Sequence, residues 1–199
     1  MARLDHLSIV APFSELERAG FRITRTPGTD GEHARILLDR MYVEVSRAPQ
    51  AELMRGVGWF VAGELSVTAE VLAGQGIAVS QPVVYRGADG EWLDVTFAGE
   101  PREVALPVLT KRTDLEEWPP PLIQPHPNGA VAVSAVHLNV EHPGFLSTLL
   151  RALKAKAMSP ARYLLSGVEI TLSASSRSSI SAVAFSCMDQ SELRLKLAN

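Results

Sequence analysis

The sequence contains only one cysteine, Cys187, among its 199 residues. A single cysteine excludes an intrachain disulfide and any zinc site built from several thiolates, and we expect Cys187 to be a small buried strand residue. No apolar run is long enough to span a bilayer, and the N-terminus lacks the basic and apolar regions of a secretory signal. We therefore expect a cytoplasmic protein of bacterial type that has no membrane partner.

An excess of positive charge is also absent. The chain has 19 Lys and Arg against 22 Asp and Glu, which gives a formal net charge of -3. This balance offers no basic surface to nucleic acid, so we expect no nucleic-acid partner. The glycine motifs of nucleotide-binding loops, the G-x-S-x-G nucleophile motif and the H-E-x-x-H zinc motif are missing as well. The composition is that of an ordinary globular protein and indicates no activity.

The sequence does contain a repeated order of strand, helix, glycine and strand. The pattern Leu-x-x-x-Gly, followed by an apolar pair one residue apart, occurs at 16–23 and again at 72–79. A third copy has an alternating strand at 134–140 and apolar residues at helical spacing in 144–157. Because alternating segments typical of strands follow each helix, every copy is expected to be one βαβββ unit.

The repeat predicts an α+β fold of tandem βαβββ modules, with curved, mixed, mostly antiparallel sheets that form a trough. We assign residues 1–116 to two modules (1–56 and 57–116), residues 117–133 to a proline-rich linker and residues 134–199 to a third βαβββ-like module. Three modules leave one unpaired. The third module either packs on the first two or completes a trough across a homodimer.

Several local signals predict where the elements begin and end. Ser14 and Glu17 have the spacing of a capping box at a helix start, and Gly20 can close that helix in the left-handed conformation. The serine-rich segment 173–179 is expected to be a hairpin loop. The strands of the third module are expected at 167–175, 180–187 and 191–197.

His6 and Glu44 are the residues best placed to carry chemistry. Strand alternation puts His6 on one face with Ser8, and Glu44 on one face with Tyr42 and Ser46. Both can point into the trough of a curled sheet whose other side is covered by the helix. Imidazole and carboxylate are the ligands expected for a divalent metal. The alternative interpretation is that both are surface polar residues without a role.

These segments resemble a known superfamily. Residues 4–25 (LDHLSIVAPFSELERAGFRITR) and 42–48 (YVEVSRA) look like the start of a vicinal-oxygen-chelate protein, and more narrowly of the glyoxalase-like domain family. Residues 59–63 (WFVAG), 85–93 (YRGADGEWL) and 126–140 (HPNGAVAVSAVHLNV) are similar to later segments of that family. The superfamily includes glyoxalase I, extradiol dioxygenases and antibiotic-resistance binding proteins.

The resemblance implies a divalent metal as cofactor. Metal ligands in this superfamily usually come from the first and last strands of paired modules, positions that His6 and Glu44 hold here. His137 holds in VHLNV the position that His6 holds in DHLSI, so it is the ligand candidate from another module. The middle copy has Ala62 at that position and supplies no ligand.

Two functions follow from the resemblance, both with a small-molecule ligand as partner. The first is a metal-dependent lyase, isomerase or dioxygenase acting on a small oxygen-rich substrate, with Glu44 exchanging protons as the catalytic residue. The second is a metal-free protein that binds or sequesters a small molecule in the same trough. Arg86 is a substrate-binding candidate, because its planar guanidinium suits an anionic group. The alternative for Arg86 is an exposed arginine at a strand end.

Overall fold

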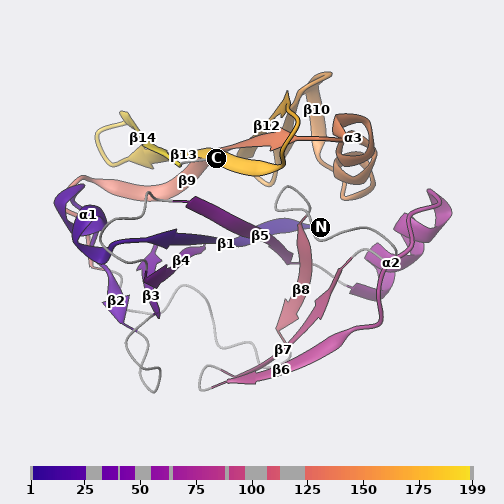
Figure 1. The fold of residues 1–199 in the computed structure, drawn as a ribbon, viewed down its shortest axis with the longest axis horizontal. Coiled ribbons are helices and arrows are strands. Elements are labelled where there is room, and N and C mark those ends of the chain that lie inside the picture. Colours follow the sequence, from indigo (N-terminus) through magenta and orange to yellow (C-terminus); the bar gives the residue numbers. More distant parts are fainter. Residues whose placement is uncertain are drawn as a thin grey trace.

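The protein consists of two β-sheets that lie one above the other (Figure 1). Both sheets are mixed and mostly antiparallel, neither closes on itself, and helices are few, so the α+β prediction is confirmed. The structure is a computed structural model. It describes residues 2–25, 33–39, 41–47, 55–62, 65–87, 90–96, 107–112 and 124–197.

The first sheet joins two βαβββ units edge to edge. Its strand order is β2-β3-β4-β1-β5-β8-β7-β6, and β1 pairs with β4 in parallel and with β5 in antiparallel fashion. The first unit contains β1 (Arg3–Ala11), α1 (Phe13–Arg18), β2 (Thr24–Arg25), β3 (His33–Leu37) and β4 (Tyr42–Arg47). The second unit contains β5 (Arg55–Ala62), α2 (Leu65–Gly74), β6 (Val83–Gly87), β7 (Gly90–Val95) and β8 (Val108–Arg112).

The second sheet is built around a long central strand, β9. Its order is β10-β11-β12-β9-β13-β14, with β9 parallel to β12 and antiparallel to β13. Strand β9 therefore has the same place in this sheet as β1 has in the first. The elements are β9 (Ala130–Val140), α3 (Pro143–Ala152), β10 (Lys156–Ser159), β11 (Arg162–Leu165), β12 (Val168–Ala174), β13 (Ser179–Cys187) and β14 (Glu192–Lys196).

The structure corrects three details predicted for this part of the chain. Two short strands, β10 and β11, follow α3 and were not expected, so β12 closes the βαβββ unit and β13 and β14 are additional. The segment 173–179 is not a hairpin loop, because β9 lies between β12 and β13 and pairs with both. Strand β9 also begins at Ala130, inside the segment predicted as linker.

The apolar faces of the two sheets meet in one core. In the first sheet Leu7 and Ile9 on β1 are fully buried, and in the second Val136 and Leu138 on β9 are fully buried within the same cluster. Their sequence neighbours on the other face of each sheet are mostly polar. The polar faces therefore point outward in opposite directions.

No helix among the described residues combines the length and apolar character needed to cross a membrane.

The end of α1 is fixed by a residue from the distant segment before β9. Gly20 has a φ of +83°, as predicted for the glycine that closes this helix. Asn128 donates from Nδ2 to the Ala19 carbonyl at 2.9 Å and from its backbone N–H to the Gly20 carbonyl at 3.2 Å. The predicted capping box at the other end is wrong. The helix begins at Phe13, after Pro12, and no side chain caps it.

We expect Gly20→Ala to destabilise the protein more than Gly76→Ala. Both glycines have positive φ, which costs another residue about 1–2 kcal/mol, but a Cβ at Gly20 would also lie 2.9 Å from Asn128 Cβ. A Cβ at Gly76 meets nothing within 4 Å. Urea unfolding of both variants measures the difference. Gly144→Ala in α3 is the control without positive φ, and it should stabilise the protein by about 0.5–1 kcal/mol. Equal losses at Gly20 and Gly76 would show that the Asn128 contact adds no cost.

Candidate functional site

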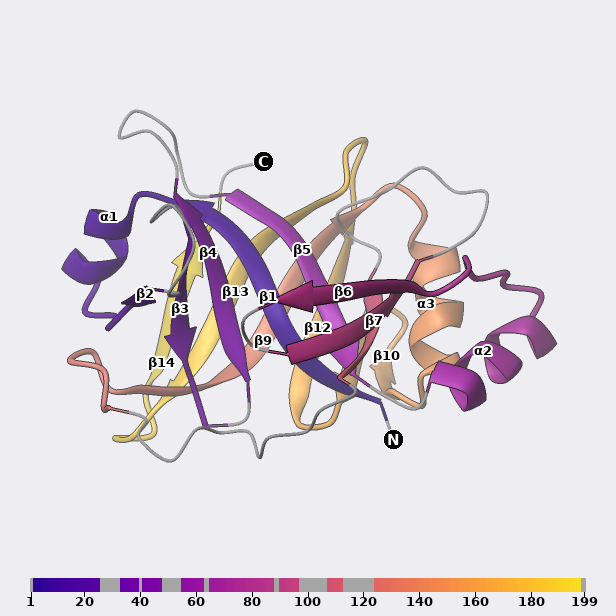
Figure 2. The same cartoon turned by 90° about the horizontal axis from the view of Figure 1, so that it is seen from below.

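The outward face of the first sheet carries the predicted site residues. The parallel register of β1 and β4 sets His6 beside Tyr42 and Ser8 beside Glu44, so all four lie on one face. Strands β6 and β7 lie below β1 and β5, on the side away from the second sheet (Figures 1 and 2). We call this face, with His6, Ser8, Tyr42 and Glu44 on its floor, the trough.

A bulge in β1 adds Asp5 to the trough. Successive residues of a regular strand point to opposite faces, yet Asp5 Oδ2 lies 2.8 Å from His6 Nδ1. The pairing with β5 slips between Leu4 and His6, leaving Asp5 as the extra residue, and such a bulge re-aims side chains. The two residues are only 9% and 8% exposed. A carboxylate that accepts a hydrogen bond from Nδ1 leaves Nε2 as the nitrogen that can accept a proton.

The imidazole of His6 is held in a stack of side chains. Its ring is nearly parallel to that of Tyr42, at an angle of 8° and a centroid distance of 4.6 Å. The guanidinium carbon of Arg35 lies 4.9 Å from the centre of the Tyr42 ring. Arg35 on β3 lies directly opposite Glu44 on β4 in the strand register, so its positive charge is on the same face of the sheet. The stack fixes the orientation of the imidazole and places a cation nearby.

Asp94 on β7 is a further carboxyl group of the trough. Burial raises the pKa of Asp94, and the charge of Asp5 raises it further. Hydrogen bonds from Thr110 and Trp92 and the nearby His6 act in the opposite direction and lower it. Asp94 is not recognisable as a site residue from the sequence, because it follows Leu93 in an ordinary alternating strand and belongs to no motif. Only the curled strand order brings it within electrostatic reach of the Asp5–His6 pair.

Glu44 lies on the trough floor, where the Ser8–Glu44 pair of β1 and β4 is next to the His6–Tyr42 pair. It accepts a hydrogen bond from Ser8 Oγ at 3.0 Å. The carboxylate is therefore tied to β1 by a hydroxyl group, while the imidazole has its own carboxylate in Asp5. The two predicted site residues share a face, but each has a separate partner.

The other predicted residues lie elsewhere. His137 is on the outward face of the second sheet, where it contacts Arg194, and the structure does not bring it to His6 because the two sheets pack through their apolar faces. Burial and the Arg194 charge lower the pKa of His137, although Glu169 and Glu192 oppose this. Arg86 lies on the edge strand β6 with 80% of its side chain exposed, and its Nε is 2.6 Å from Glu91 Oε2.

The donors in the trough do not fit the metal site implied by the resemblance, which takes ligands from paired modules. The resemblance makes Ala62 the counterpart of His6. With that alignment, the pairing of β5 with β8 makes Arg112 the counterpart of Glu44. Neither alanine nor arginine is a metal ligand. Within the described residues no group of three or more His, Cys, Asp or Glu could hold a metal ion.

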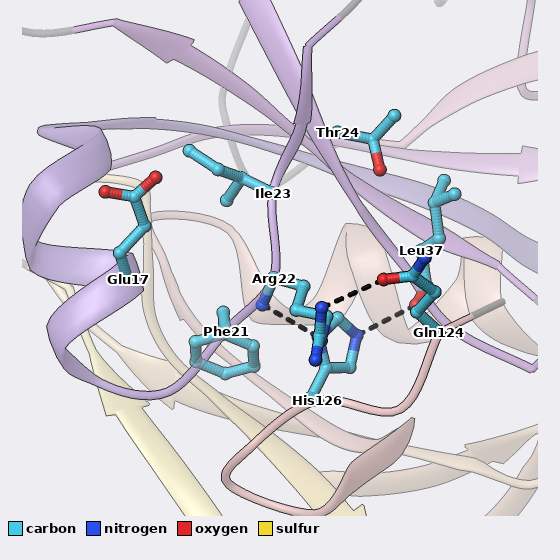
Figure 3. A pocket seen from close by; sticks show the side chains of 8 residues that line it. All are labelled: Glu17, Phe21, Arg22, Ile23, Thr24, Leu37, Gln124 and His126. Carbon is cyan, nitrogen blue, oxygen red and sulfur yellow. Dashed lines mark hydrogen bonds between the residues drawn. The ribbon is translucent and has the colours of Figure 1, made fainter.

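A pocket lies beside α1 and contains His126 (Figure 3). His126 is 5% exposed, although it lies outside any helix or strand. Its Nδ1 accepts a hydrogen bond from the Arg22 backbone N–H at 3.0 Å, and Nε2 lies 2.9 Å from the Leu37 carbonyl, to which it donates. Burial lowers the pKa of His126. The hydrogen bond to the Leu37 carbonyl raises it, and the charge of Arg22 lowers it further. The neutral imidazole thus joins the segment before β9 to the first unit.

Comparison with known proteins yields structural likenesses only. No protein-family model matches the sequence, and no curated protein matches it. A hypothetical protein from Staphylococcus aureus superposes with a TM-score of 0.63 at 9% identity, covering 98% of both chains. The Mn(II)-bound glyoxalase from Novosphingobium aromaticivorans superposes with a TM-score of 0.56 at 14% identity, covering 94% of this chain and 67% of that one. At these identities the comparison establishes the fold, which is glyoxalase-like.

Proposed function

We propose that this protein is a vicinal-oxygen-chelate protein that binds a small oxygen-rich molecule in the trough and acts on it as a lyase or isomerase. The observation that carries the proposal is the Asp5–His6 pair, which a bulge sets on the trough of a glyoxalase-like fold. A buried imidazole oriented by a carboxylate is suited to general base catalysis. The Mn(II)-bound neighbour supports the fold and the general class of chemistry.

The proposed step is removal of a proton from the carbon next to a carbonyl group. Asp5 keeps the imidazole proton on Nδ1, so Nε2 takes the proton from carbon. The electron pair left on carbon moves to the carbonyl oxygen and forms an enolate. Arg35 supplies a fixed positive charge on the same face, which stabilises that developing negative charge. In an α-hydroxycarbonyl substrate the hydroxyl proton then moves to the former carbonyl oxygen. Return of the abstracted proton from Nε2 to the former carbonyl carbon, while the other oxygen forms the new carbonyl, completes an isomerisation.

A divalent metal would draw on His6 and Glu44, which share the trough floor. It would supply Lewis-acid stabilisation of the enolate. Because the donors around them do not fit such a site, no step above uses a metal.

The test is deuterium exchange measured by ¹H NMR in D₂O. We expect the protein to exchange the C–H next to the carbonyl in α-hydroxyketones or α-ketoaldehydes, and His6→Gln to lose this activity. Dialysis against a chelator, followed by assay with and without Mn²⁺, should change the rate by less than about twofold.

Three results would count against the proposal. Saturable binding without exchange would identify a binding protein instead. A strict requirement for Mn²⁺ would show that the reaction depends on a metal. Exchange that persists in His6→Gln would show that the imidazole is not the base.

A further inference from the structure

The geometry points to a second ligand site, the groove beside α1, which takes a small zwitterion. The groove has a volume of about 480 Å³, within the range of small-molecule sites. It contains none of the trough residues described above. Its walls are formed by Glu17, Phe21, Arg22, Ile23, Thr24, Leu37, Gln124 and His126 (Figure 3).

One wall presents a guanidinium group that is already fixed in place. Arg22 donates from Nε to the Pro125 carbonyl at 2.8 Å and from Nη1 to Gln124 Oε1 at 2.9 Å. Among the residues that the structure describes, Nη2 has no protein partner. A guanidinium held at two points loses little freedom when it binds a third group, and its planar fork matches a carboxylate. This wall therefore suits the acidic end of a ligand.

The opposite wall presents a carboxylate. Glu17 projects from α1 on the far side of the groove from Arg22 (Figure 3). No ion pair joins Glu17 to Arg22 or to another residue of the described segments. Two opposite charges that face one groove without neutralising each other can be bridged by a ligand that carries both charges.

The surface between the charged walls mixes polar and apolar groups and carries no further charged side chain. Phe21 is 3% exposed and packs against His126 and Phe185, while Ile23 and Leu37 are half-buried. His126 contributes a neutral ring whose two nitrogens are occupied by Arg22 and Leu37. The lining thus combines one cation and one anion with a floor of mixed polarity. A short amino acid, with a free amine and a free carboxylate, has the matching charges.

An NMR titration with 6-aminohexanoate, hexanoate and hexylamine tests this site on the full chain. We expect the zwitterion to bind about threefold to fivefold more tightly than either single-charge compound, with shifts at Arg22 and Ile23. Glu17→Gln should weaken binding of the zwitterion about threefold to fivefold, the range of an exposed ion pair, and leave hexanoate binding unchanged. Glu70→Gln removes an exposed carboxylate on α2 outside the groove, and it should change neither.

The outcomes separate this site from the trough. His6→Gln should leave binding of 6-aminohexanoate unchanged, whatever its effect on proton exchange. Equal affinity for hexanoate and the zwitterion would overturn the role of Glu17. No saturable shift with 6-aminohexanoate, or loss of its binding in His6→Gln, would overturn the groove as its site.

Discussion

Replacing Asp5 by asparagine is expected to slow proton exchange in the trough by about 10²–10⁴-fold, the contribution of a positioned general base. Asp5 Oδ2 accepts from His6 Nδ1 at 2.8 Å and so fixes which nitrogen carries the proton. An asparagine amide can instead donate to Nδ1. The proton would then sit on Nε2, the nitrogen that has to accept one.

The expected signature is a fall in kcat with little change in KM, measured by the same deuterium exchange. The substitution alters the tautomer of His6 and leaves the shape of the trough floor intact. Ser8→Ala, which removes the hydroxyl bonded to Glu44 on the same face, is the matched control and should cost less than about fivefold. If Asp5→Asn were as active as Ser8→Ala, the imidazole would not be working as an oriented base.

The exchange rate of Glu44→Gln decides whether the Asp5–His6 pair or Glu44 transfers the proton. The sequence predicts Glu44 as the catalytic residue, whereas the proposal gives proton transfer to His6. If Glu44→Gln lowered the exchange rate as much as Asp5→Asn does, the assignment of Glu44 as the catalytic residue would be favoured.

Replacing His126 by phenylalanine should destabilise the protein by about 2–4 kcal/mol. The new ring fills the same space but accepts nothing from the Arg22 N–H and donates nothing to the Leu37 carbonyl. Each buried polar group left without a partner costs about 1–3 kcal/mol. Urea unfolding measures the loss. The control is His142→Ala, an exposed histidine that also precedes a proline, which should stay within about 0.5 kcal/mol of the wild type.

The same histidine should make stability depend on pH. The pKa of His126 is lowered in the folded state from an ordinary value of 6.5. Its contribution is therefore complete above about pH 6.5 and is lost as the pH falls through the lower folded value, because the unfolded chain binds the proton more readily. His137 titrates in the same direction, so the difference between wild type and His126→Phe isolates His126. A difference that is constant from pH 7.5 to 5 would contradict the effect.

The sequence predicted those features that depend on local pattern. Alternation in β1 and β4 put His6 with Ser8 and Tyr42 with Glu44, and the pairing of these strands agrees. The glycine at the end of α1 was identified because only a residue tolerant of positive φ fits there. Both inferences require only neighbouring residues along the chain.

Features that depend on pairing over long range could not be predicted in this way. Asp5 reaches the trough only because β1 slips against β5. Asp94 comes from a strand three places away in the sheet. His126 lies in a loop before a proline, and its partners are backbone groups that any residue could supply. No short motif in the sequence records any of these three positions.

The place of β13 has a consequence for the order in which the chain folds. This strand pairs with β9 and packs against β5, and its Phe185 contacts Phe21 with a centroid distance of 5.0 Å. Segments leave the ribosome from the N-terminus onward, so the first sheet emerges well before β13, one of the strands that cover its apolar side. Such distant contacts slow folding. A nascent chain stalled before residue 179 would leave the apolar surface under β13 exposed and depend on chaperones to keep it from aggregating.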